Sequence, residues 1–191
     1  MRTRKPMLIL AGLMLLMAAT RFHHFGSMSL LPDASLAAFF IAGFYLPAAW
    51  VLPVLIAEAG LVDYVAISFA GTSSYCVTAA YVFLVPTYAA MWLGGRWYAT
   101  RDRLGLGLER ASLLVLAVVV SSSIAFLISN GSFYLFSGRI EALTWSGYVT
   151  QFAEYYPPYV AVAAAYVAVV AVVHTLFAQL GGDLGKPIAR G

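Results

Sequence analysis

The sequence has one cysteine, few charged residues and no recognisable nucleotide-binding motif. Cys76 is the only cysteine among 191 residues, so the chain cannot form an internal disulfide. Charged residues make up 10% of the sequence, against roughly 25% in an average soluble domain. A Walker-type phosphate loop, a GxGxxG motif and a CxxC motif are all absent, so the chain shows no means of hydrolysing ATP or binding a dinucleotide.

Apolar residues dominate what is there. They make up 62% of the chain, with a mean hydropathy of +0.87, and each helical span of a membrane needs about 20 of them. The length therefore predicts an all-α integral membrane protein with six transmembrane helices in a single domain over residues 1–191. The net charge of +3 comes from basic residues scattered along the chain, so no nucleic-acid partner is expected.

The expected spans cover residues 7–19, 34–54, 53–69, 77–93, 111–129 and 157–179. Pro47 and Pro53 should kink the second span, and the Pro157-Pro158 pair should open the sixth, after an aromatic lid over residues 148–159. This topology leaves only Arg21 and Arg139, of the 11 Lys and Arg, on the outer side. Such a bias predicts that both termini are cytoplasmic.

Cys76 lies where the polar run 71–74 meets an apolar run, at the outer surface of the membrane. Three interpretations of the thiol stay open: a small buried hydrophobe, a reactive or intermolecular thiol, and a soft metal ligand. Tyr81 follows five residues later and should reach the same cavity if a helix starts near Tyr75.

Asp63 is a carboxylate in an apolar segment, which normally faces a cavity or a partner. Alternatively, Asp63 and Glu58 lie near an inner turn and are solvated. Arg139 could bind a carboxamide or phosphate of a ligand, or it could pair with Glu141.

Three stretches resemble one family. The outer string ATRFHHFGSMSLLPDAS, the carboxylate Asp63 and the lone cysteine in SSYCVTAAY resemble the BtuM family of small bacterial cobalamin transporters, which are similar in fold to the S-components of energy-coupling factor transporters. The resemblance covers nearly the whole chain. It implies an S-component-like bundle in the bacterial inner membrane that takes up cobalamin (vitamin B12).

The resemblance also implies roles for individual residues. Cys76 would face the periplasm and ligate the cobalt of the corrinoid, and this ligation would help to remove cyanide from cyanocobalamin. His24, Asp63, Tyr81 and Arg139 would lie around the corrinoid. A soft thiolate suits this metal. The chain would act mainly as a transporter, with cyanide removal as its one chemical step.

The first span departs from the pattern of related transporters. S-components that dock on an energising module commonly carry small residues four apart, but Ala11 is followed by Leu15 and Ala18 by Phe22. This pattern favours a chain that acts alone or with a partner other than such a module.

Two other functions remain open at this stage. A membrane redox protein could bind haem through His23 or His24 together with His174, although His174 is expected at the inner side. A small assembly factor would bind no ligand and would leave Cys76 silent.

Overall fold

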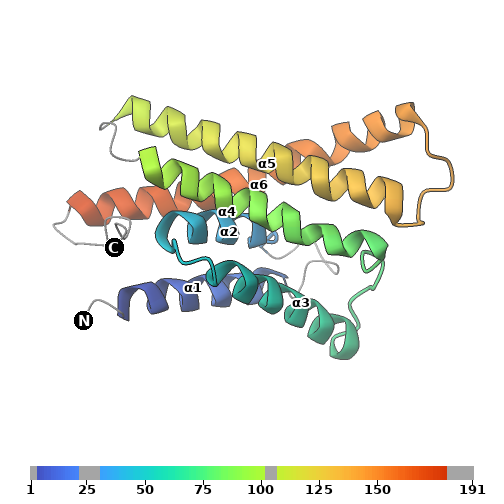
Figure 1. Ribbon diagram of the computed structural model, residues 1–191, viewed down its shortest axis with the longest axis horizontal. Helices are drawn as coiled ribbons and strands as arrows, with labels where there is room; N and C mark the ends of the chain where they lie inside the picture. The colour runs from blue at the N-terminus through green and yellow to red at the C-terminus, as the bar shows by residue number, and fades with distance from the viewer. Residues whose placement is uncertain (1–3, 22–30, 102–106, 180–191) are drawn as a thin grey trace.

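The computed structural model describes residues 4–21, 31–101 and 107–179 and, within them, contains six α-helices and no strand. The helices are α1 (Arg4–Arg21), α2 (Ser35–Tyr45), α3 (Val51–Phe69), α4 (Leu84–Arg101), α5 (Leu108–Phe136) and α6 (Trp145–Gln179), with a short 3-10 helix, η1 (Ala79–Phe83), before α4. They lie side by side in an elongated bundle (Figure 1). We call the end near Cys76 the cysteine end and the opposite end, where α4 stops and α5 starts, the Arg110 end.

Three of these helices are long and apolar enough to cross a membrane. They are α3, α5 and α6, and α2 is a shorter apolar helix of 11 residues. Many of their large apolar side chains face outward, as lipid-facing side chains do; Leu61, Val115 and Val169 are each more than 60% exposed. The helical content and these surfaces are those of an α-helical membrane protein.

The second helix is shorter than the sequence suggested. α2 stops at Tyr45, before Pro47. The expectation that Pro47 and Pro53 kink one long helix is therefore wrong. Pro53 instead lies in the first turn of α3, where a missing backbone N–H costs no helical hydrogen bond. With 11 residues, α2 is about 17 Å long, which is roughly half of a 30 Å hydrocarbon layer.

The fourth helix starts later than expected. Cys76 lies in a turn, and η1 and α4 follow it. The expectation that Cys76 and Tyr81 share one helix starting near Tyr75 is therefore wrong. Gly71 ends the preceding segment with a φ of 70°, a conformation that glycine adopts without steric cost.

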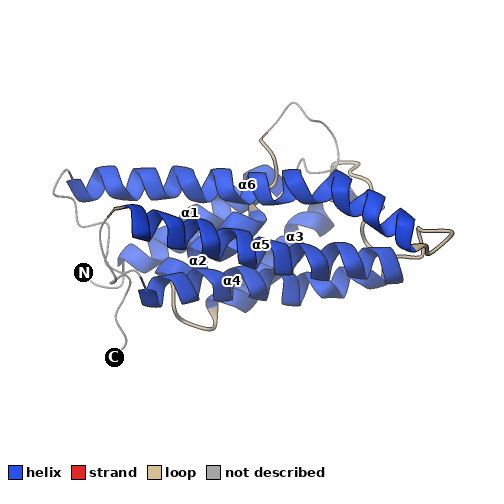
Figure 2. Ribbon diagram, turned by 90° about the horizontal axis from the view of Figure 1, so that it is seen from above, coloured by secondary structure: helices blue, strands red, loops and turns tan. Residues whose placement is uncertain are grey.

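The sixth helix starts earlier than expected, at Trp145, and runs through Pro157 and Pro158. Proline removes an intrahelical hydrogen bond and bends a helix, and α6 changes direction along its length (Figure 2). The aromatic residues expected to form a lid mostly pack against α5. Phe152, Tyr156 and Tyr159 all contact the ring of Phe126, at centroid distances of 5.2, 5.3 and 5.1 Å.

The core is centred on α2, in which nine of the 11 residues are buried. Glycines let α2 and α4 approach closely. A Cβ atom added at Gly43 would overlap the backbone of Trp92, and one added at Gly95 would overlap the backbone of Phe40. Small residues at such crossings are typical of membrane helix packing. α2 is thereby held inside the bundle, and its N-terminus is held beside the ends of α1 and α3 that carry the polar site.

Candidate functional site

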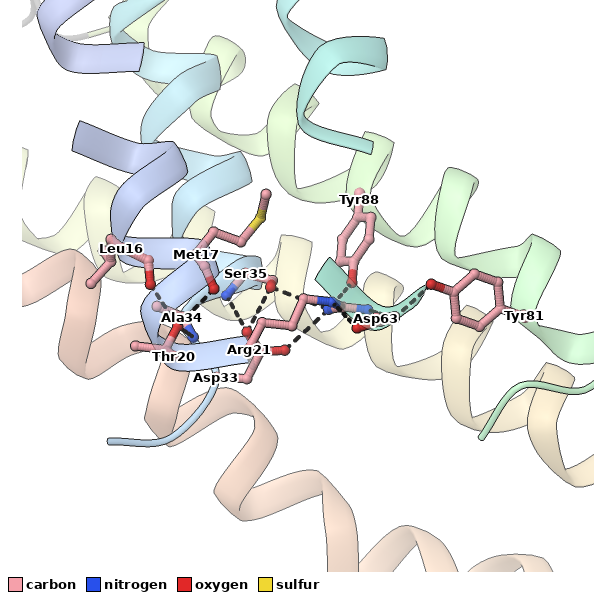
Figure 3. Close-up of polar contacts among 10 residues, drawn as sticks. All are labelled: Leu16, Met17, Thr20, Arg21, Asp33, Ala34, Ser35, Asp63, Tyr81 and Tyr88. Carbon is pink, nitrogen blue, oxygen red and sulfur yellow. Dashed lines mark hydrogen bonds and ion pairs between the residues drawn. The ribbon is translucent and has the colours of Figure 1, made fainter. Parts of the chain in front are cut away.

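The centre of the candidate site is a buried arginine at the end of α1. Arg21 is 6% exposed and binds Asp63 of α3 with two parallel hydrogen bonds. Its Nε donates to Oδ1 at 2.7 Å and its Nη2 donates to Oδ2 at 2.6 Å. This two-point geometry is the strongest form of an arginine–carboxylate pair. Figure 3 shows Asp63 between Arg21 and Tyr81.

Arg21 also holds the start of α2 and the first turns of α4. Its Nη1 donates to the Tyr88 hydroxyl at 2.7 Å and to Asp33 Oδ2 and Ser35 Oγ at 3.2 Å each. Asp33 in turn accepts hydrogen bonds from the Ser35 backbone N–H and hydroxyl, at 2.9 and 2.6 Å. One guanidinium group therefore connects α1, α2, α3 and α4. Because such a group is very costly to bury without partners, this network fixes the relative positions of these helices.

Tyr81 of η1 completes the environment of Asp63. Its hydroxyl donates to Asp63 Oδ2 at 2.6 Å, so the carboxylate accepts three hydrogen bonds from side chains. A carboxylate offers about four acceptor positions. One position, on Oδ1, is left for a further donor.

Cys76 lies on the surface of this network, in the turn between α3 and η1. The Val77 backbone N–H donates to the Ser74 carbonyl at 3.0 Å, which makes Tyr75 and Cys76 the two central residues of the turn. The Cys76 side chain is half-buried. Burial raises the pKa of its thiol above the ordinary value, and the Asp63 carboxylate adds to this rise. The thiol is therefore held in its protonated form until a metal or a higher pH removes the proton.

Arg139 supplies an opposing positive charge. It lies on the connection between α5 and α6, is exposed, and places its guanidinium carbon 4.9 Å from the centroid of the Tyr75 ring. Arg139 and Arg21 both lower the pKa of the Cys76 thiol, against the larger effect of burial. The connection between α5 and α6 thus touches the cysteine turn.

A pocket of about 240 Å³ opens beside the turn. Its lining residues come from α3, the cysteine turn and η1: Gly60, Asp63, Tyr64, Ile67, Ser74, Val77 and Tyr81. Ser74 and Val77 flank the two central residues of the turn. The pocket is smaller than the 300–1,000 Å³ of typical small-molecule sites, so it can take only part of a large ligand.

No protein-family model matches the chain, and no curated protein matches its sequence. The chemistry of the site is therefore inferred from its own side chains. Within the described ranges, no three His, Cys, Asp or Glu side chains form a group that could hold a metal ion.

The structure brings together four of the five residues singled out from the sequence. Asp63 and Tyr81 are hydrogen-bonded, and Asp63 and Arg139 each lie close enough to Cys76 for their charges to act on its thiol. His24, like its neighbour His23, lies outside the described residues. Asp63 is 5% exposed, so the alternative of a solvated carboxylate at an inner turn is wrong.

Sequence reasoning missed Arg21, which we had placed in an outer loop. α1 continues to Arg21 and ends inside the bundle, well short of the far ends of α5 and α6 (Figure 1). Its other partners were missed as well, because their role depends on the position of Arg21: Asp33, Ser35 and Tyr88. The signal was present: an arginine and an aspartate, both adjoining apolar runs, are expected to pair when buried.

Proposed function

We propose that the chain is a corrinoid-binding membrane transporter in which the Cys76 sulfur is an axial ligand of the cobalt. A six-span arrangement, with both termini cytoplasmic and Cys76 facing the periplasm of a bacterial inner membrane, is part of the proposal. The observation that carries it is the position of one soft ligand in a turn beside a pocket. The remaining equatorial ligands of the metal would come from the corrin ring of the transported molecule.

The size of the pocket fits this arrangement. A volume of about 240 Å³ takes an edge or side group of a corrinoid, while the ring lies over the cysteine turn and the connection that carries Arg139. Corrinoid side chains end in amides, which donate hydrogen bonds. Asp63 lines this pocket, and its unused acceptor position can receive one of them.

Ligation is a ligand exchange without a change of oxidation state. The thiol loses its proton to water, and the sulfur donates an electron pair to cobalt in place of the corrinoid's own axial nitrogen base, which leaves with its electron pair. Electron donation along the axial direction weakens the bond to the opposite ligand, so cyanide leaves as an anion with its bonding pair and water takes its position. Loss of cyanide is thus a consequence of binding, and transport remains the main function.

A visible spectrum tests this proposal. The purified chain is mixed with cyanocobalamin, and the spectra of the native protein, Cys76→Ala and Ser74→Ala are compared. Ser74 lies in the same turn but has no sulfur, and because Ser74 lines the pocket, Ser74→Ala reports a contact with the ligand that does not involve ligation of the cobalt. We expect the native chain to retain the corrinoid with a shifted spectrum, Ser74→Ala to keep the shift even if it binds less tightly, and Cys76→Ala to lose the shift.

Retention of corrinoid with an identical spectrum in all three proteins would refute sulfur ligation. Failure of all three to retain it would refute the cobalamin proposal altogether. Haem is added in a parallel sample, because a haem-binding redox protein was the second function considered. The structure favours it less, since His174 lies at the Arg110 end and bonds to the Tyr45 hydroxyl at 2.7 Å.

A further inference from the structure

A second and larger cavity lies at the Arg110 end of the bundle, away from Cys76. Its volume is about 430 Å³, which is within the range of small-molecule sites. Residues of α2, α4, α5 and α6 line it together with Gly107, which precedes α5. None of its lining residues belongs to the corrinoid site proposed above.

The walls of this cavity are apolar along most of their length. Phe40, Phe44, Leu114, Val167 and Val170 contribute side chains to it. A free sugar or nucleotide would bury its polar groups against these walls without partners, which is unfavourable. An acyl chain has no such cost.

Aromatic contacts keep the cavity preformed. The Phe44 ring packs on Tyr45, Tyr98 and His174, with centroid distances of 4.6, 5.5 and 6.3 Å. Tyr45 and His174 are joined by their 2.7 Å hydrogen bond, which connects α2 to α6. These contacts hold the wall in place, so a ligand does not have to order it.

Polar and positively charged groups are also among the lining residues. Arg110, in the first turn of α5, is the charged residue of the lining, and Thr175 and Gln179 add polar groups from the last turns of α6. Glu109, its acidic neighbour in α5, does not line the cavity. Basic pockets between membrane helices, near the helix ends, bind the head groups of anionic lipids.

We propose that this cavity binds one anionic phospholipid of the surrounding membrane, with the phosphate on Arg110 and an acyl chain along the wall formed by α2 and α6. The lipid would link the end of α2 to α5 and α6. α2 has 11 residues and is too short to span the membrane, so a lipid at its end would also fill part of the hydrocarbon depth that α2 does not reach. The inference does not depend on the corrinoid proposal, because the two sites share no residue.

Native mass spectrometry of the full chain in detergent tests the proposal. The probes are phosphatidylglycerol and phosphatidylcholine with identical acyl chains, so only the head-group charge differs. We expect the native chain to bind one phosphatidylglycerol about fivefold more tightly than phosphatidylcholine, since about 1 kcal/mol per basic residue is typical of such contacts. Equal binding of the two lipids would overturn the proposal.

Two pairs of variants separate the head group from the chain. Arg110→Gln should weaken phosphatidylglycerol binding about fivefold, whereas Arg101→Gln should not, because Arg101 is exposed and stacks on Trp97 outside the cavity. Ala171→Phe, which places a ring in the cavity, should weaken both lipids, whereas Ala168→Phe, on the exposed side of the same helix, should not. Arg110→Lys should restore most of the preference if the charge is what matters.

The same spectra report other occupants. If Ala171→Phe leaves lipid binding unchanged while inorganic phosphate competes with phosphatidylglycerol, the site binds a free anion and the lipid proposal is wrong. If the native chain appears as a dimer that Ala171→Phe dissociates, the cavity faces a second copy, and the proposal is equally wrong. Circular dichroism of each variant confirms that it folds. The comparison of Arg110→Gln with Arg101→Gln and that of Ala171→Phe with Ala168→Phe each suffice as a test, so the failure of one variant to fold leaves the other comparison.

Discussion

The pair formed by Arg21 and Asp63 makes a sharp prediction about stability. Asp63→Asn keeps the shape of the side chain but removes its charge, which leaves the Arg21 guanidinium with Asp33 as its remaining anionic partner, at 3.2 Å. Removing one member of a buried ion pair typically costs 3–5 kcal/mol. We therefore expect Asp63→Asn and Arg21→Met each to lower the free energy of unfolding by about 4 kcal/mol.

The double variant should be less damaged than the sum of the two. Arg21→Met with Asp63→Asn removes both charges together, and removing both members of a buried ion pair costs much less than leaving one charge buried alone. Tyr88 and Ser35 still lose their hydrogen bonds from Arg21, which costs about 1–3 kcal/mol. We expect a total loss of about 2 kcal/mol, well below the roughly 8 kcal/mol expected if two independent losses of this size were added.

Equilibrium unfolding in detergent micelles measures the four proteins of this cycle. Arg101→Met is the matched control, because Arg101 is an exposed arginine near a helix end; it should change stability by no more than about 0.5 kcal/mol. Additive losses in the cycle, to within about 0.5 kcal/mol, would show that the two charges do not stabilise each other and would refute our account of the site.

Three further predictions concern the turn, the tyrosine and the helix crossing. Because burial raises the pKa of the Cys76 thiol and only the thiolate binds a metal, corrinoid ligation should weaken about tenfold for each pH unit below that pKa; a spectral titration that is flat over about three pH units would contradict this. Tyr81→Phe should cost about 1.5–3 kcal/mol, typical of a hydrogen bond to a charged group, and unfolding measurements that find no loss would show that the bond to Asp63 is not formed. Gly95→Ala should lower the free energy of unfolding by about 3 kcal/mol, because its new Cβ meets the α2 backbone. Gly12→Ala is the control and should be neutral or stabilising, because its new Cβ meets nothing within 4 Å. Equal effects of the two variants in the same unfolding assay would argue against the close crossing of α2 and α4.

The sequence predicted the number of helices better than their ends. Six helices were expected and the described residues contain six, of which three are long and apolar enough to cross a membrane. Proline positions were misleading in both directions: Pro47 follows the end of α2, whereas Pro157 and Pro158 lie inside α6. Whether a proline ends or bends a helix depends on how neighbouring helices satisfy the freed carbonyl groups, and a single sequence does not reveal those neighbours.

The candidate site could be predicted only in part for a related reason. Asp63 stood out because a carboxylate is rare in an apolar segment, and Tyr81 and Cys76 were close to it in the chain. Arg21 comes from another helix, 42 residues before Asp63, and local sequence does not show how deep α1 ends. A search for opposite charges that both border apolar runs would have paired Arg21 with Asp63.

The short helix α2 has a consequence for how polar groups are distributed with depth. Peptide groups beyond its ends need partners from the protein, because lipid offers none. Arg96 supplies one by donating to the Pro47 carbonyl at 2.8 Å, and Thr20 supplies one at the other end by accepting from the Ala34 N–H at 3.0 Å. Only about 17 Å of apolar helix separates these two polar layers. Along α2 the apolar layer of the protein is therefore roughly half as thick as the 30 Å hydrocarbon core of a typical bilayer, and a charge moving along this line would cross a shorter region of low dielectric constant.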